Sequence, residues 1–133
     1  MRYYLLGLGS NIQPDQHLAR ACSELAQRYQ LLASSPVIAT PTEGSGFHYP
    51  FRNQLALIAT GLDATHLKQE LLKLEADFGR EPKSPERKHH DRTIDVDILV
   101  ESNHAEDCLR EPLQDRYYQA VMEQWPAAQT LKV

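Results

Sequence analysis

The sequence predicts one α+β domain, in which four strands form an antiparallel sheet and two helices pack on one face of that sheet. The chain has 133 residues, the usual size of one domain with one core. Its apolar residues alternate in some segments, as in strands, and recur every three or four residues in others, as in helices. These segments follow the order strand, helix, strand, strand, helix, strand. We therefore expect residues 1–133 to form a single domain.

The first half of the chain is expected to form a strand, a helix and a second strand. The run from Tyr3 to Gly9 is aromatic and aliphatic and ends at a Gly-Ser-Asn turn, as a buried strand does. Pro14 suits the first position of a helix, and apolar residues follow it at helical spacing up to Tyr29. A strand is expected from Leu32 to Thr40, followed by a mobile glycine-containing loop.

The second half repeats the pattern with clearer boundaries. Phe51 to Thr60 alternates as a strand does, and Asp63 is a good N-cap for a helix that ends at a left-handed Gly79. The charged segment Arg80 to Asp91 has no period and predicts a loop, and Thr93 to Val100 predicts the last strand.

The resulting βαββαβ order is that of the ferredoxin-like fold, a four-stranded antiparallel sheet with helices packed on it. Beyond Asn103 the pattern weakens, and Gln114 to Gln124 is expected to form a third, shorter helix in a short C-terminal extension.

Composition excludes several classes of protein. With 14 Lys and Arg against 18 Asp and Glu, the net charge of -4 disfavours nucleic-acid binding by a basic face. No apolar run is long enough to cross a bilayer, and the start of the chain does not resemble a signal peptide, so we expect a cytoplasmic protein without membrane contact. Cys22 and Cys108 lie in no metal-binding or redox motif and are expected to be free thiols.

The segment Arg92-Thr93-Ile94-Asp95-Val96-Asp97-Ile98-Leu99 carries the sharpest chemical signal. Residues two apart in a strand point to the same side, so Asp95 and Asp97 share one face while Val96 and Ile98 face the core. Two neighbouring carboxylates repel each other unless a cation or a proton lies between them, and magnesium prefers such oxygen ligands. The alternative is an ordinary exposed face of an antiparallel strand, where polar and apolar residues alternate.

The loop before this strand adds positive charge. Arg80, Arg87 and Arg92 can each grip phosphate oxygens with parallel hydrogen bonds, so the loop and the aspartates together predict a nucleoside triphosphate site. The alternative is a solvated loop whose acidic residues pair with its cations. His89 and His90 lack the spacing of a transition-metal site, which makes that chemistry unfavoured.

Together these motifs resemble the 6-hydroxymethyl-7,8-dihydropterin pyrophosphokinase family of folate biosynthesis. The resemblance covers Tyr3 to Val100 and includes Gly9-Ser10-Asn11, Thr40-Pro41, Phe51-Arg52-Asn53 and Gly79-Arg80, besides the segment of the two aspartates. It implies a ferredoxin-like enzyme that transfers pyrophosphate from ATP to the pterin hydroxymethyl group with two Mg²⁺ ions. ATP and the pterin would be its partners, with no nucleic acid, and the protein would be a monomer.

The resemblance also implies a role for each matching residue. Asp95 and Asp97 would bind both metal ions and, with Arg80 and Arg92, form the catalytic group. The nucleotide would contact Arg80, Arg87, Arg92 and Ile98, and the pterin would contact Thr40, Pro41, Phe51, Asn53 and Tyr118.

The chain departs from the family in two places. His89-His90-Asp91-Arg92 stands where the family has Trp-Gly-Pro-Arg, and Glu111-Pro112-Leu113-Gln114 lacks the family's histidine. The family also has an Arg-x-Phe segment that stacks on the pterin, and Arg116-Tyr117-Tyr118 is the candidate for its place in this chain. These departures motivate an alternative, a non-catalytic pterin- or nucleotide-binding relative of the enzyme. An RNA-binding module of the same fold is disfavoured, because the central strands lack paired exposed aromatic residues.

Overall fold

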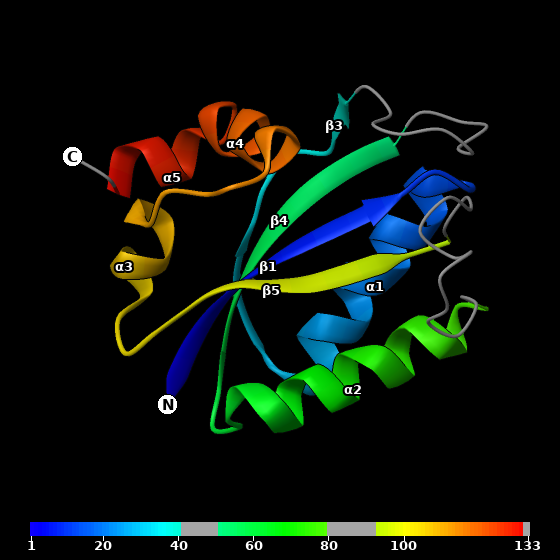
Figure 1. Cartoon of the computed structure of the whole chain (residues 1–133), viewed down its shortest axis with the longest axis horizontal. Helices are drawn as coiled ribbons and strands as arrows, with labels where there is room; N and C mark the ends of the chain where they lie inside the picture. The colour runs from blue at the N-terminus through cyan, green and yellow to red at the C-terminus, as the bar shows by residue number, and fades with distance from the viewer. Residues whose placement is uncertain (41–50, 80–92, 132–133) are drawn as a thin grey trace.

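The structure is a computed structural model that describes residues 1–40, 51–79 and 93–131 (Figure 1). Its strands are β1 (Arg2–Ser10), β2 (Gln30–Ser34), β3 (Ile38–Thr40), β4 (Phe51–Thr60) and β5 (Asp95–Ser102). Its helices are α1 (Pro14–Arg28), α2 (Ala64–Asp77), α3 (Ala105–Arg110), α4 (Arg116–Glu123) and α5 (Pro126–Leu131). The expected loops at 41–50 and 80–92 lie outside the described residues.

The strands form one antiparallel sheet in the order β2-β4-β1-β5, and β3 pairs with the first residues of β4. Helix α1 connects β1 to β2 past β4, and α2 connects β4 to β5 past β1. Each connection skips one strand, which is the split βαβ arrangement. The predicted α+β, ferredoxin-like fold is therefore confirmed.

Local signals in the sequence set the ends of the two long helices. Helix α1 begins at Pro14, which needs no hydrogen-bond acceptor there. In α2 the Asp63 side chain accepts a hydrogen bond of 2.9 Å from the backbone N–H of His66. Gly79, just after α2, has a φ angle of 83°, which a residue with a β-carbon rarely adopts.

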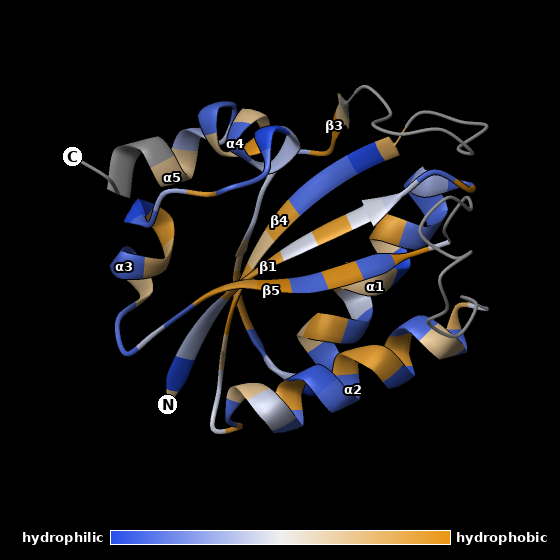
Figure 2. Cartoon of the chain, viewed as in Figure 1, coloured by the Kyte–Doolittle hydropathy of each residue, from blue (hydrophilic) through white to orange (hydrophobic). Residues whose placement is uncertain are grey.

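Helices cover both faces of the sheet, and each face has its own core (Figure 1). The core under α1 and α2 contains Leu6, Leu8 and Val96 from the strands, and the core under α3, α4 and α5 contains Leu5, Leu57 and Trp125. In Figure 2 apolar and polar segments alternate along β5. Successive side chains of a strand point to opposite faces, and Val96 of β5 enters the core under α1 and α2.

The expectation of helices on one face alone is incomplete. The shorter helix expected at 114–124 is α4, but α3 and α5, of 6 residues each, were not predicted. Elements this short show less than two turns of periodicity, and His104 supplies no side-chain hydrogen bond as the N-cap of α3.

The prediction of one continuous strand from Leu32 to Thr40 is wrong, because this segment forms two strands, β2 and β3. The chain leaves the sheet at Ser35, and β2 and β3 pair with β4 separately. Ser35 fills the break, because its backbone N–H donates to the carbonyl of Leu55 at 2.8 Å and its hydroxyl accepts from the backbone N–H of Leu55 at 2.8 Å. Pro36 follows, and a proline cannot donate to a ladder.

Two further observations bear on the expectations from composition. Cys22 and Cys108 are both free thiols, as expected. Within the three described ranges, no helix combines the length and the apolar character needed to cross a membrane.

Candidate active site between strand β5 and the C-terminal helices

The two aspartates share one face of β5, as strand spacing predicts. Asp95 pairs with Gly9 and Asp97 pairs with Gly7 across the β1–β5 ladder. Val96, between them, is fully buried in the core on the opposite face. Both carboxylates are half-buried and lie beside glycines, and the side chains of Tyr118 and Asn53 occupy the space above these glycines.

Burial and mutual repulsion act on this pair. The pKa of Asp97 is raised from its ordinary value of 3.8 to about 6, first by burial and then by the negative charge of Asp95 and a hydrogen bond with its side chain. Such a bond between carboxyl groups requires a proton on one of them. The pair therefore favours a positive charge between its oxygens, whether a proton or a metal ion.

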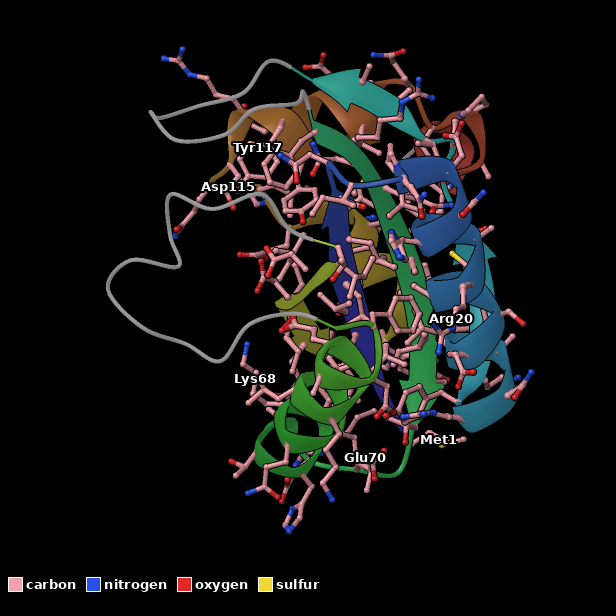
Figure 3. All side chains as sticks on the ribbon, turned by 90° about the vertical axis from the view of Figure 1, so that its right-hand side faces the viewer. Met1, Arg20, Lys68, Glu70, Asp115 and Tyr117 are labelled. Atoms are coloured by element: carbon pink, nitrogen blue, oxygen red, sulfur yellow. The ribbon has the colours of Figure 1, made fainter. Side chains whose placement is uncertain are left out.

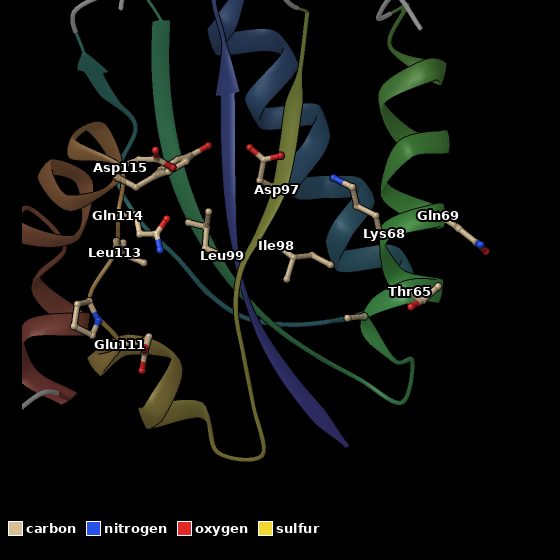
Figure 4. Close-up of a pocket in the computed structure, with 13 residues that line it drawn as sticks. Thr65, Lys68, Gln69, Asp97, Ile98, Leu99, Glu111, Leu113, Gln114 and Asp115 are labelled. Carbon is tan, nitrogen blue, oxygen red and sulfur yellow. The ribbon is translucent and has the colours of Figure 1, made fainter. Parts of the chain in front are cut away.

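Helix α2 contributes two residues that the sequence analysis missed. Lys68 extends from α2 toward Asp97 (Figure 4), and its charge acts to lower the pKa of that aspartate. Glu75 is buried, and its Oε2 accepts a hydrogen bond of 2.9 Å from the backbone N–H of Val96. Both lie on the side of α2 that packs against β5, a contact that helical spacing alone does not reveal.

Three of the residues expected to contact a pterin meet above Gly9. A β-carbon added at Gly9 would lie 2.9 Å from Oδ1 of Asn53, 3.7 Å from Cδ1 of Phe51 and 4.0 Å from the hydroxyl oxygen of Tyr118. Phe51 and Asn53 come from β4 and Tyr118 from α4, so the place is built from distant parts of the chain. Asn53 offers both a donor and an acceptor there, beside two aromatic rings.

A cavity of about 890 Å³ adjoins Asp97 (Figure 4). It is lined by Asp97, Ile98 and Leu99 of β5, by residues 64, 65, 68 and 69 of α2, by the segment 111–115 and by Tyr118. Figure 3 shows the same arrangement from the side, with Asp115 and Tyr117 on one side of β5 and Lys68 on the other. The volume is that of a site for a ligand of nucleotide size.

The structure brings six of the predicted site residues to this region: Asp95, Asp97, Ile98, Phe51, Asn53 and Tyr118. Ile98 was also expected to face the core, and it does contact the core under α1 and α2 while lining the cavity. The backbone of Thr40 pairs with Phe51 at the end of β3. Pro41, Arg80, Arg87, Arg92, His89 and His90 lie outside the described residues.

The donor atoms fit magnesium. Among the described residues, no three histidine, cysteine or carboxylate side chains gather to hold a metal ion by themselves. Magnesium usually takes one or two protein carboxylates and completes its shell with water and substrate phosphates. Asp95 and Asp97 match that requirement, because their repulsion is relieved by a cation and a ligand-sized cavity adjoins them.

Fold and site together define a ferredoxin-like α+β protein in which a carboxylate pair lies beside a large cavity and beside the cluster of Phe51, Asn53 and Tyr118 around Gly9. Residues 5–126 match the family described as 7,8-dihydro-6-hydroxymethylpterin-pyrophosphokinase. The chain belongs to this family.

Two bacterial relatives carry the name 2-amino-4-hydroxy-6-hydroxymethyldihydropteridine pyrophosphokinase. The protein from Campylobacter jejuni is 34% identical over 99 residues, which cover 71% of this chain and 60% of the relative. The protein from Porphyromonas gingivalis is 34% identical over 107 residues, which cover 77% of this chain and 71% of the relative. The match thus spans about 60% of the length of the first relative and about 71% of the second.

Proposed function

We propose that this protein transfers the terminal diphosphate of ATP to the hydroxymethyl oxygen of 6-hydroxymethyl-7,8-dihydropterin, with Mg²⁺. The observation that carries this proposal is the position of Asp95 and Asp97. Asp97 lines the cavity with Ile98, and Asp95 is the β5 partner of Gly9, around which Phe51 and Asn53 meet, so the pair joins these two places. A transfer between two bound substrates needs its metal and charge-neutralising groups at such a junction.

The residues of the site have different binding roles according to their positions. Asn53 and Phe51 bind the edge and the face of the acceptor ring, and Ile98 and Leu99 form an apolar surface for the nucleoside. Lys68 carries a positive charge to the edge of the cavity, where phosphate oxygens of a bound nucleotide would lie. Arg80, Arg87 and Arg92 remain predicted phosphate contacts.

In the transfer, the hydroxymethyl oxygen forms a bond to the β-phosphorus of ATP and the bond from that phosphorus to the oxygen of AMP breaks. The proton of the alcohol O–H group is transferred to a carboxylate of the aspartate pair. Magnesium, held by Asp95 and Asp97, would supply neutralisation of phosphate charge. A cytoplasmic location and a monomeric state remain predictions from the sequence.

The test is the formation of AMP from ATP in the presence of Mg²⁺ and 6-hydroxymethyl-7,8-dihydropterin. We expect AMP and diphosphorylated pterin in equal amounts, and a loss of at least 100-fold in rate for Asp95→Ala and Asp97→Ala. Asp63→Asn is the matched control, since Asn caps a helix as well as Asp and Asp63 itself does not line the cavity. Binding of both ligands without AMP would instead establish the non-catalytic alternative.

A further inference from the structure

The ring of Tyr118 lies directly on Gly7. A β-carbon added at Gly7 would lie 2.4 Å from Cζ and 2.7 Å from Cε2 of Tyr118, well inside contact distance. Only 2% of Tyr118 is exposed. A glycine at this point of β1 therefore makes the space that the tyrosine ring occupies, and the ring cannot move closer to the strand.

The position of the ring places the hydroxyl group near Gly7 and Gly9, the β1 partners of the two aspartates. The hydroxyl oxygen lies 2.7 Å from the added β-carbon position at Gly7 and 4.0 Å from that at Gly9. Asp97 and Asp95 are the β5 partners of these two glycines, and both carboxylates interact electrostatically with the tyrosine. A tyrosine hydroxyl is protonated at neutral pH, so this group is a hydrogen-bond donor.

A phenylalanine at position 118 would form the same wall but would have no polar atom at this point. The hydroxyl lies near Gly9, which Asn53 and Phe51 also surround, and it interacts electrostatically with both aspartates. A ligand oxygen that lies between the ring-binding residues and the metal-binding residues is thus within reach of this donor. In the proposed reaction, that oxygen is the alcohol oxygen of the acceptor.

We propose that Tyr118 is a specificity-determining residue, whose hydroxyl donates a hydrogen bond to the alcohol oxygen of the acceptor. This inference rests on the proposed function and adds to it the way in which the reacting oxygen is recognised. The hydrogen bond uses one lone pair of that oxygen and leaves the other for the phosphorus. The contact exists with the bound substrate, so its loss raises KM for the acceptor more than it lowers kcat.

The test compares two ligands on two proteins. Binding of 6-hydroxymethylpterin and of 6-methylpterin, which lacks the alcohol, is measured by calorimetry with Mg²⁺ and a non-hydrolysable ATP analogue. We expect Tyr118→Phe to reduce the preference for the hydroxymethyl compound about fivefold, the usual value of one neutral hydrogen bond, and to leave binding of the methyl compound unchanged. The reaction should show the same change in KM with kcat within about twofold.

The outcomes separate the two proposals. An unchanged preference in Tyr118→Phe overturns the role of the hydroxyl and leaves the proposed function standing. A wild-type protein that binds neither pterin overturns the proposed function, and this inference with it.

Gly7→Ala tests the position of the ring independently. The added methyl group displaces the tyrosine, so we expect Gly7→Ala to lose the preference as Tyr118→Phe does, and to bind the methyl compound more weakly as well. Gly61→Ala is the matched control, because nothing lies within 4 Å of a β-carbon added there. If Gly7→Ala binds both pterins as the wild type does, the tyrosine ring does not shape the pterin site and the inference is wrong.

Discussion

Asp97 carries the electrostatic strain of the site, because it is buried beside another carboxylate. Its pKa of about 6 exceeds its ordinary value of 3.8, so between these values the folded protein binds more protons than the unfolded chain. The free energy of unfolding of the metal-free protein therefore falls as the pH rises through this interval. Below pH 3.8 the carboxyl group of Asp97 is protonated in both states, so its charge no longer destabilises the folded protein.

We expect Asp97→Asn to remove this pH dependence, because an amide does not titrate. Urea unfolding of both proteins at a series of pH values measures it, and the difference between the two curves isolates Asp97 from the other titrating groups. Without metal, the variant should gain stability over the wild type as the pH rises from 3.8 to about 6. Parallel curves across this interval would show that the pKa of Asp97 is not raised in the folded protein.

For single residues, the sequence predicts the features that one strand determines by itself. The alternation of β5 is local, so the shared face of Asp95 and Asp97 follows from their spacing. Gly7 and Lys68 gave no such signal. Gly7 matters because of Tyr118, more than a hundred positions away, and Lys68 matters because α2 packs beside β5. Contacts of this kind depend on the three-dimensional arrangement, which periodicity does not contain.

At the scale of elements, Glu75 joins α2 to β5. It is a buried carboxylate that accepts the backbone N–H of Val96, the residue between the two aspartates. The other edge of β5 pairs with β1, so this hydrogen bond holds the strand from its second side. The spacing of the carboxylates therefore depends on α2 as well as on the sheet.

We expect Glu75→Ala to lower the free energy of unfolding by about 1–3 kcal/mol, because it leaves a buried N–H without its acceptor. Glu75→Gln keeps an acceptor oxygen at the same reach and should lose less than half as much. Urea unfolding measures both. Equal losses in the two variants would mean that the charge of Glu75, and not the hydrogen bond to Val96, is what matters.

The sequence predicted most elements but not all of their boundaries. Pro14, Asp63 and Gly79 mark helix ends through local chemistry, and the structure agrees at each. The break at Ser35 was missed, because Val37 and Ile38 continue an apolar run across Pro36. Short helices α3 and α5 were missed for a related reason, since their packing on the sheet supports them more than their own sequences do.

At the scale of the whole molecule, one sheet separates two cores and the site lies at the end of β1. The core under α3, α4 and α5 holds Trp125, the single tryptophan of the chain, which is 3% exposed. The same helices position Tyr118 and the segment that lines the cavity. The C-terminal helices are therefore part of both the fold and the site.

Because strands β1 and β4 contribute to both cores, we expect the two cores to unfold together. Tryptophan fluorescence reports on the core around Trp125, and far-ultraviolet circular dichroism reports on the helices as a whole. Their urea transitions should coincide. A fluorescence transition at lower urea would show that the C-terminal helices leave the sheet first.

The central claim is that the aspartate pair holds a divalent cation together with a polyphosphate. Electron paramagnetic resonance of Mn²⁺, in place of Mg²⁺, measures this directly in the presence of a non-hydrolysable ATP analogue. We expect Mn²⁺ binding by the wild type and by Asp63→Asn, and binding at least tenfold weaker in Asp95→Asn and Asp97→Asn. Equal binding of Mn²⁺ and nucleotide by all four proteins would contradict it.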